Sequence, residues 1–117
     1  MSGNACVVVA SESRPLPAVT LGEVLATSDL PGGVVNLLTG QVGELAPPLA
    51  SHMDVNAIDL TGVGDAELAR DLELEAAENV KRVLPAPVIE PNWETTPDPR
   101  RILAFTEVKT VWHPTGV

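Results

Sequence analysis

The only cysteine of the chain, Cys6, is the residue whose type could most directly do covalent chemistry. A thiolate is a strong nucleophile, so a single cysteine is a candidate for thiol catalysis. Cys6, however, lies inside the apolar run of residues 5–10, where a free cysteine packs as a small hydrophobic side chain. One cysteine also excludes an internal disulfide and a CxxC site. We therefore expect a buried, structural role for Cys6 and no catalytic residue in the chain.

Histidines and carboxylates are the other groups that could act as acids, bases or metal ligands. His52 and His113 are the only histidines, and neither stands at zinc-ligand spacing from a cluster of Cys, His or carboxylate residues. Acidic residues crowd the stretch 65–78, where a helix would spread them over a polar, solvated face. These residues are Asp65, Glu67, Asp71, Glu73, Glu75 and Glu78. We expect a loop or capping role for His52 and no metal site.

A glycine-rich segment could bind phosphate. Residues 62–67, GVGDAE, follow the GxGxxG pattern of dinucleotide-binding loops until the last position, where Glu67 replaces a glycine that allows close helix–strand packing. A pyrophosphate needs free backbone N–H groups at the positive end of a helix. Asp65 and Glu67 bring negative charge there, with no nearby cation. We expect binding of a dinucleotide at this loop to be poor or lost.

The strands that must position these residues are short and apolar. Runs rich in β-branched residues, without polar alternation, predict strands covered on both faces at 5–10, 34–38 and 55–60. Strands that alternate with helices form a parallel sheet through right-handed crossovers. The sequence therefore predicts an α/β fold, a partial Rossmann-like parallel sheet with flanking helices.

The helices are predicted from apolar residues at spacings of three and four. This spacing favours a helix from Leu16 to the residue before Asp29 and a longer one over 65–83. The longer helix has acidic residues in its first turn and basic residues in its last, which suits the helix dipole. A weaker helical stretch at 44–51 is interrupted by Pro47-Pro48, so we expect one irregular turn there.

The C-terminal third of the chain has a different composition. Five prolines between positions 85 and 99 exclude a helix and a central strand, and they predict an extended connector over 85–101. Residues 102–112, ILAFTEVKTVW, mix apolar and polar residues as a half-exposed strand does. The predicted organisation is a domain over 1–84, this connector, and a terminal strand with its tail over 102–117.

The charge balance excludes some partners. Seven basic and 16 acidic side chains give a net charge of −9. Nucleic acids and anionic membranes are bound mainly through Lys and Arg, so we expect neither as a partner. No apolar run approaches the ~20 residues of a membrane-spanning helix, and no signal segment follows Met1. The expected location is the cytoplasm.

Several segments resemble one family when they are taken in order. They are Gly3-Asn4-Ala5, VVVASE (7–12), Pro15-Leu16, LPGGVVNLLTG (30–40) and LASHMDVNAIDLTG (49–62). Together they resemble the cofactor domain of NAD(P)-dependent aldehyde dehydrogenases, and FTEVKTVW (105–112) is similar to the C-terminal strand of that superfamily. The resemblance implies a truncated member in which the catalytic domain, with its cysteine nucleophile and glutamate base, is absent.

The resemblance also implies which positions correspond to the family's cofactor ligands. Glu12 corresponds to a glutamate that binds the adenosine ribose, whereas Val9 stands in place of the ribose-binding lysine. Thr61 and Gly62 belong to the pyrophosphate loop, in which Val63 replaces a serine that meets the phosphates. We expect Glu12, Thr61 and Gly62 to be vestigial cofactor contacts, and NAD or NADP binding to be weak.

In the same family the terminal strand belongs to the oligomerisation sheet, where it adds to a neighbouring subunit. An uncovered strand with aromatic and β-branched residues is an association site unless it is protected, and tryptophan is enriched at interfaces. The candidate interface residues are Phe105, Val108, Val111 and Trp112. The alternative is that this strand folds back onto the chain's own sheet.

Two functions are consistent with these features. The first is an aldehyde-dehydrogenase-like protein, inactive alone, that is an assembly or regulatory subunit in a homo-oligomer or beside a full-length aldehyde dehydrogenase. The second is the NAD(P)-binding piece of a split oxidoreductase that another chain completes. A degenerate product without a selected role is a third. Cofactor binding by the purified chain distinguishes the first two.

Overall fold

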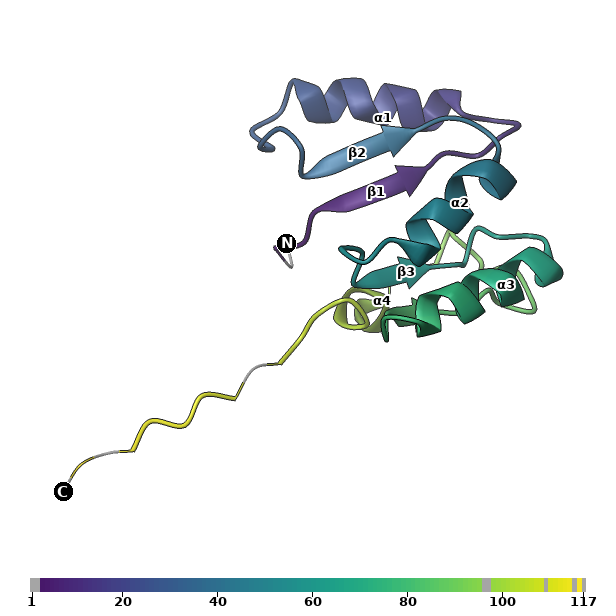
Figure 1. Cartoon of the computed structure of the whole chain (residues 1–117). Helices are drawn as coiled ribbons and strands as arrows, with labels where there is room; N and C mark the ends of the chain where they lie inside the picture. Colours follow the sequence, from purple (N-terminus) through teal and green to yellow (C-terminus); the bar gives the residue numbers. More distant parts are fainter. Residues whose placement is uncertain (1–2, 96–97, 109, 115, 117) are drawn as a thin grey trace.

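The computed structural model describes residues 3–95, 98–108, 110–114 and 116, in which strands and helices alternate along most of the chain (Figure 1). The strands are β1 (Cys6–Val9), β2 (Val35–Leu38), β3 (Ala57–Asp59) and β4 (Arg82–Leu84). The helices are α1 (Leu16–Ala26), α2 (Val42–Ser51), α3 (Ala66–Ala77) and α4 (Pro99–Leu103). Helices combined with small parallel sheets confirm the predicted α/β class.

The strands pair in parallel, two by two. β1 lies beside β2 in a register that places Cys6 opposite Val35, and β3 lies beside β4 with Ala57 opposite Arg82. Within the described residues no ladder joins β1 to β3. The single three-stranded sheet that we expected is therefore two separate sheets, because residues predicted to be helical form β4 and supply β3 with a partner.

Helix α3 begins where the sequence predicts and ends earlier. Its buried face has the spacing expected for a helix that packs on a sheet, and consists of Ala69, Leu72 and Ala76. The helix ends at Ala77 and residues 82–84 form β4, which corrects the helix predicted over 65–83. The basic residues expected in its last turn consequently lie beyond the helix.

A Schellman motif ends α3 at this point. The backbone N–H of Lys81 donates to the carbonyl of Ala76 (3.0 Å), and that of Val80 donates to the carbonyl of Ala77 (3.2 Å). Val80 occupies the left-handed position of the motif with a φ of 57°, and it is 88% exposed. Glycine is usual there, because a branched side chain is strained at positive φ.

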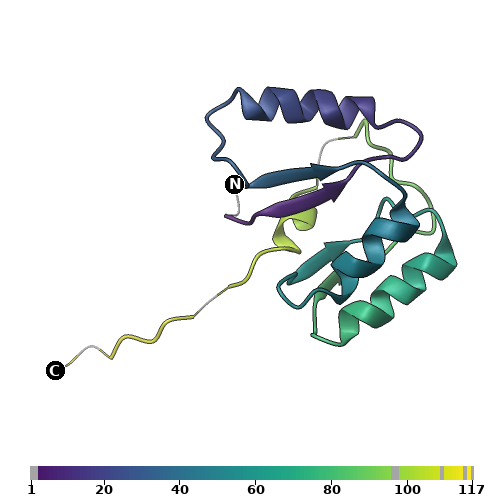
Figure 2. The same cartoon turned by 45° about the horizontal axis from the view of Figure 1, so that its top comes forward.

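Helix α2 forms throughout Val42–Ser51 and contains Pro47 and Pro48, where we expected one irregular turn. Each proline removes a helical N–H and crowds the preceding turn, at a cost of ~3 kcal/mol or more. The burial of Ala46 and Ala50 in the core opposes this cost. These small side chains let α2 and α3 lie side by side (Figure 2).

The hydrophobic core is small and lies between α2, α3 and the β3–β4 sheet. Its buried members are Ala46, Ala50, Leu60 and Leu72, and the residues packed against them are Val42, Ile58, Val63, Leu68, Val83 and Ala86. Because Leu60 follows β3 directly and is fully buried, the core fixes the start of the loop that carries Thr61 and Gly62.

The β1–β2 sheet is covered less completely. Helix α1 packs so closely on β2 that a Cβ added to Gly22 would lie 2.8 Å from Leu37 Cδ1. No residue of α1 is buried, however, and on β1 Cys6 is exposed and Val7 is 46% exposed. The expectation that β1 is covered on both faces, with a buried Cys6, is therefore wrong: a two-stranded sheet has too few neighbours to cover it.

The C-terminal residues form a helix and an extended tail (Figure 1). Ile102 and Leu103, expected in a strand, lie in α4, because Asp98 at the N-cap and Pro99 at the first position favour a helix. No described residue of 104–112 lies in a strand. The terminal strand expected over 102–112 is thus not formed in the single chain.

This arrangement is extended for 117 residues. The radius of gyration is 16.7 Å, against about 13 Å for a compact domain of this length. The accessible surface is 9406 Å², against about 6,100 Å² for a folded monomer of this mass. The chain therefore leaves an unusually large surface in contact with solvent.

Candidate functional site

The first candidate cofactor residue, Glu12, lies in the loop after β1. Its Oε1 accepts a hydrogen bond from the backbone N–H of Val42, the first residue of α2. A carboxylate at this place satisfies a free N–H and interacts favourably with the positive end of the helix. Glu12 thus joins the loop after β1 to the beginning of α2.

The second candidate, Thr61, lies after β3 and belongs to a polar cluster. Its backbone N–H donates to Asp59 Oδ1 (2.9 Å), and its Oγ1 accepts from Arg101 Nη2 (3.0 Å). Arg101 Nη2 also lies 3.0 Å from Asp59 Oδ2. The Arg101 guanidinium stands over the ring of Trp93, 5.2 Å from its centroid, at a cation–π distance. We call Asp59, Thr61, Trp93 and Arg101 the arm cluster.

The arm cluster corrects one expectation from the sequence. We expected no cation near the pyrophosphate loop, yet α4 brings Arg101 to the carboxyl end of β3. No spacing rule could have found this residue, since it lies 42 positions from Asp59 in sequence. Trp93 was likewise not predicted to contribute here.

The first N–H groups of α3 bind a side chain of the chain itself. Asp65 is the N-cap of α3, and its Oδ1 accepts from the backbone N–H of Glu67 (2.9 Å) and of Leu68 (3.3 Å). Gly62, the third candidate, is exposed, and a Cβ built on it would meet no atom within 4 Å. The N-termini of α2 and α3 therefore both carry carboxylates of this chain, while Gly62 faces open space.

Helix α4, which carries Arg101, is held by a second ion pair. Arg100 Nη2 lies 2.6 Å from Asp98 Oδ2, and Asp98 Oδ1 accepts from the backbone N–H of Arg100 (2.9 Å). The side-chain hydrogen bond with Arg100 is the main reason that the pKa of Asp98 is below its usual value. The same bond raises the pKa of Arg100.

A buried lysine was not found by sequence reasoning. Lys81 is 8% exposed, and its Nζ donates to the carbonyl of His52 (2.7 Å) and to Asn79 Oδ1 (2.5 Å). His52 is the C-cap of α2, so the ammonium lies at the negative end of that helix. Of the loop or capping role expected for His52, the structure gives the cap, and Lys81 ties α2 to β4.

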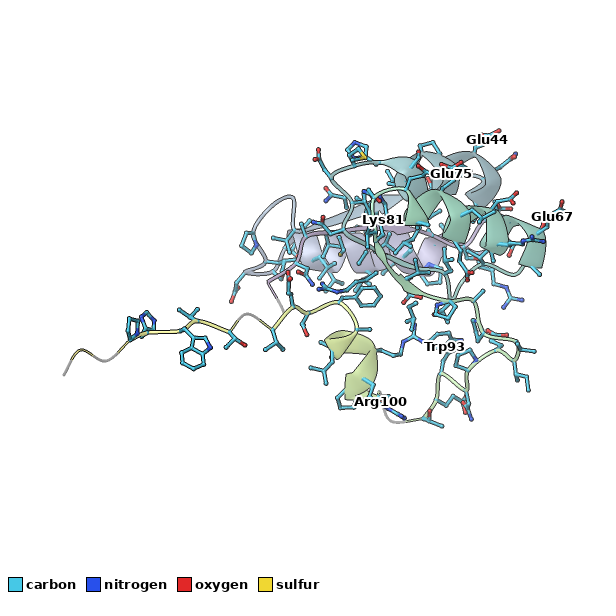
Figure 3. The ribbon with its side chains drawn as sticks, turned by 60° about the horizontal axis from the view of Figure 1, so that its bottom comes forward. Glu44, Glu67, Glu75, Lys81, Trp93 and Arg100 are labelled. Atoms are coloured by element: carbon cyan, nitrogen blue, oxygen red, sulfur yellow. The ribbon has the colours of Figure 1, made fainter. Side chains whose placement is uncertain are left out.

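The acidic residues expected on a solvated face of 65–78 are exposed, and so is Glu44 of α2. Glu44, Glu67 and Glu75 are exposed, and Figure 3 shows Glu44 and Glu67 at the margin of the molecule. Among the described residues no group of three or more His, Cys, Asp or Glu side chains could hold a metal ion. None of the described helices has the length and apolar character needed to cross a membrane.

The four candidate interface residues fall into two groups. Phe105 is half-buried, and its carbonyl accepts from Nδ2 of Asn4 (2.8 Å), which lies two residues before β1. Val108, Val111 and Trp112 lie in the extended tail, where Val108 is 91% and Trp112 is 89% exposed. Phe105 therefore attaches the tail to the body, and the other three are in contact with solvent.

Comparisons with known proteins identify the family to which the N-terminal part of the chain is similar. The family model described as "Aldehyde dehydrogenase family" matches residues 1–85. A mitochondrial aldehyde dehydrogenase of Leishmania tarentolae is 37% identical over 81 residues, which are 69% of this chain and 16% of the relative. A betaine aldehyde dehydrogenase of Rhizobium leguminosarum bv. trifolii is 37% identical over 83 residues, 71% of this chain and 16% of the relative.

A third relative, hydroxyisobutyraldehyde dehydrogenase of Mycolicibacterium austroafricanum, is 32% identical over 81 residues, 69% of this chain and 16% of the relative. No solved structure matches the chain. The chain thus spans about a sixth of the length of these relatives. Since the family model covers most of the 117 residues, the chain belongs to the aldehyde dehydrogenase family.

Proposed function

We propose that this chain is a non-catalytic assembly or regulatory subunit of the aldehyde dehydrogenase family, which associates through its C-terminal tail, residues 106–116. The observation that carries the proposal is the solvent exposure of Val108, Val111 and Trp112 on a tail that extends from the body (Figure 1). Large apolar side chains of this kind, gathered on one segment, mark an association site.

The arrangement at the helix N-termini supports a non-catalytic role. Glu12 and Asp65 bind backbone N–H groups of α2 and α3. A dinucleotide would have to displace these carboxylates and then lie beside their negative charge. A carboxylate of the chain thus stands where each helix would meet a pyrophosphate.

Deletion of residues 107–117 tests the proposal and leaves α4 intact. We expect the full chain to be an oligomer by light scattering and the deletion variant to have the mass of a monomer, because the apolar tail is lost. Deletion of residues 114–117 alone is the matched control, since it keeps Trp112, and should leave the mass of the oligomer unchanged. An unchanged mass for the longer deletion, or a monomeric full chain, contradicts the proposal.

One observation favours a second candidate, the NAD(P)-binding piece of a split dehydrogenase. Arg101 presents a guanidinium beside Thr61 at the carboxyl end of β3, where it could pair with a phosphate group. Calorimetric titration with NAD and with NADP separates the two functions. Micromolar binding that Glu12→Ala and Arg101→Gln both weaken supports the cofactor-binding piece, and no measurable heat supports the assembly subunit.

A further inference from the structure

The face formed by α2 and α3 contains an open groove that the core does not fill. The groove has a volume of about 310 Å³ and lies between Pro47 of α2 and the side chains of α3. Of its apolar residues, Leu72 is fully buried and Leu74 is 61% exposed. The complete lining is Pro47, Leu68, Asp71, Leu72, Leu74 and Glu75. We call this hollow the α2–α3 groove.

One residue of the groove is unfavourable for the helix that carries it. Pro47 lies inside α2, where a proline removes a helical N–H and crowds the preceding turn. Its rigid, apolar ring is half-buried and lines the groove. Departures from local preference are expected mainly at functional positions. Pro47 is therefore a sign, separate from the shape of the groove, that this surface contacts a partner.

The charged residues that line the groove are both acidic. Asp71 and Glu75 lie one turn apart on α3, and Glu67 lies one turn before Asp71. Glu44 adds a carboxylate from α2, and Figure 3 shows it on the same pair of helices as Glu67 and Glu75. None of the ion pairs among the described residues involves these four side chains. Because like charges four residues apart on a helix repel each other, a cationic partner would relieve a repulsion that the free chain retains.

The backbone around the groove favours a helix as the partner. The groove lies between two helices, whose backbone groups are hydrogen-bonded within each helix, so it offers no strand edge. An extended peptide buried there would leave its own N–H and C=O groups unpaired. A helix satisfies its backbone internally and can pack its ridge of side chains into the space between two neighbouring helices. Its apolar residues would enter the groove, and its Lys or Arg residues would meet the carboxylates.

No described helix of this chain has that chemistry. Helices α1 and α2 contain neither Lys nor Arg, and α3 contains only Arg70. Helix α4 has two arginines, but it is five residues long and both side chains already pair, with Asp98 and Asp59. The groove therefore fits a helix of a different protein better than a second copy of this chain.

We infer that the α2–α3 groove binds a basic amphipathic helix of another protein. Apolar side chains of that helix contact Pro47, Leu72 and Leu74, and its Lys or Arg side chains pair with Asp71 and Glu75. The net charge of −9 attracts such a helix over a longer range and speeds its association. The inference is separate from the proposed function, which concerns the tail over 106–116 and neither α2 nor α3.

A synthetic helix of leucine and lysine, about 14 residues long with its leucines on one face, is the probe. Labelled with fluorescein, it should bind the full chain with a micromolar dissociation constant, measured by fluorescence anisotropy at low salt. The same peptide with glutamate in place of every lysine keeps the leucine face and reverses the charge. This control peptide should not bind.

Substitution of the two lining carboxylates locates the site. Asp71→Asn with Glu75→Gln should raise the dissociation constant of the lysine peptide about tenfold or more, because both charge pairs are lost. The matched control, Glu23→Gln with Glu73→Gln, removes two charges from exposed positions outside the groove and should change the constant less than about twofold. Equal weakening by both variants would show that the peptide responds only to net charge, and would overturn the inference.

A second substitution tests the apolar part of the contact. Leu74→Ser should raise the dissociation constant about fivefold, because the peptide then buries less apolar surface. Leu21→Ser removes a similarly exposed leucine from α1 and should leave binding unchanged. Circular dichroism of every variant checks that the fold is kept.

The outcomes separate this inference from the proposed function. Deletion of residues 107–117 should leave binding of the lysine peptide unchanged, because it alters neither helix. If the peptide does not bind the full chain, or binds the Asp71→Asn, Glu75→Gln variant equally well, the inference is overturned while the proposed function stands. If that variant changes the mass of the oligomer in light scattering, the groove is a contact between copies of this chain, and a helix of another protein is not its occupant.

Discussion

At the scale of single residues, carboxylates make polar contacts that join the segments after β1 and β3 to other parts of the chain. Glu12 and Asp65 satisfy backbone N–H groups at two helix N-termini, and Asp59 pairs with Arg101. Each carboxylate has a partner within the chain, so the three residues stabilise the fold. A helix N-terminus whose N–H groups were free could instead bind an anion. From the sequence alone, these three carboxylates could equally well have been predicted to contact a ligand.

A single residue also offers a gain in stability. Val80 lies at φ 57° and is almost fully exposed, so its side chain strains the backbone and packs on little. Val80→Gly should raise the free energy of unfolding by about 1 kcal/mol, because glycine adopts this conformation without a clash. Urea unfolding followed by circular dichroism measures the change.

Val24→Gly is the matched control, since Val24 is exposed inside α1. There the substitution should lower stability by roughly 0.5 kcal/mol, the ordinary effect of glycine in a helix. Equal losses for the two variants would show that Val80 is not strained.

At the scale of elements, the pattern of apolar residues predicted the positions of three strands and of the longest helix. The apolar runs located β1, β2 and β3, and the spacing of Ala69, Leu72 and Ala76 located α3. The end of α3 was missed because Val80 continues the apolar periodicity of the helix. The left-handed position at this end is usually occupied by glycine or asparagine, and neither stands at position 80. The full length of α2 was missed because its prolines oppose a helix that is stabilised by burial of Ala46 and Ala50.

The connection between α2 and β4 depends on one buried side chain. Lys81→Met should lower the free energy of unfolding by about 1–3 kcal/mol, because the amide oxygen of Asn79 loses the ammonium donor and the carbonyl of His52 keeps only the weaker bonds from the Val55 N–H and Asn79 Nδ2. Arg70→Met, at an exposed position of α3, should change stability little. Chemical denaturation compares the two. A loss no larger for Lys81→Met than for the control would exclude a stabilising role for the buried ammonium.

At the scale of the whole molecule, the position of α4 against the carboxyl end of β3 could not be predicted. The proline-rich composition indicated an extended connector, but the contact between Arg101 and Asp59 joins residues 42 positions apart. The arrangement of the strands in two sheets could not be predicted from the sequence either. It depends on which strands pair with each other and not on the residue pattern within any one strand.

The arm cluster should hold α4 against the body in a salt-dependent manner. Asp59→Asn removes the ion pair with Arg101, and because this pair is partly exposed the effect is modest. In a Trp112→Phe background, we expect the Trp93 emission to shift to the red and trypsin to cleave after Arg101 a few-fold faster. In the chain that keeps Asp59, added salt should change the Trp93 emission and the cleavage rate in the same direction, because salt screens the ion pair.

Asp54→Asn is the control, since it removes the same charge from an exposed loop position outside the arm cluster. It should alter neither the Trp93 emission nor the rate of cleavage. If Asp59→Asn behaves like this control, α4 is held against the body by contacts other than the ion pair.

The large solvated surface of the single chain also affects its thermodynamics. The heat capacity change on unfolding and the steepness of the denaturant transition both scale with the area that becomes newly hydrated. A chain that leaves 9406 Å² hydrated while folded has less area still to expose. Its monomer should therefore have a flatter stability curve with temperature than compact domains of equal length, and a broader unfolding transition.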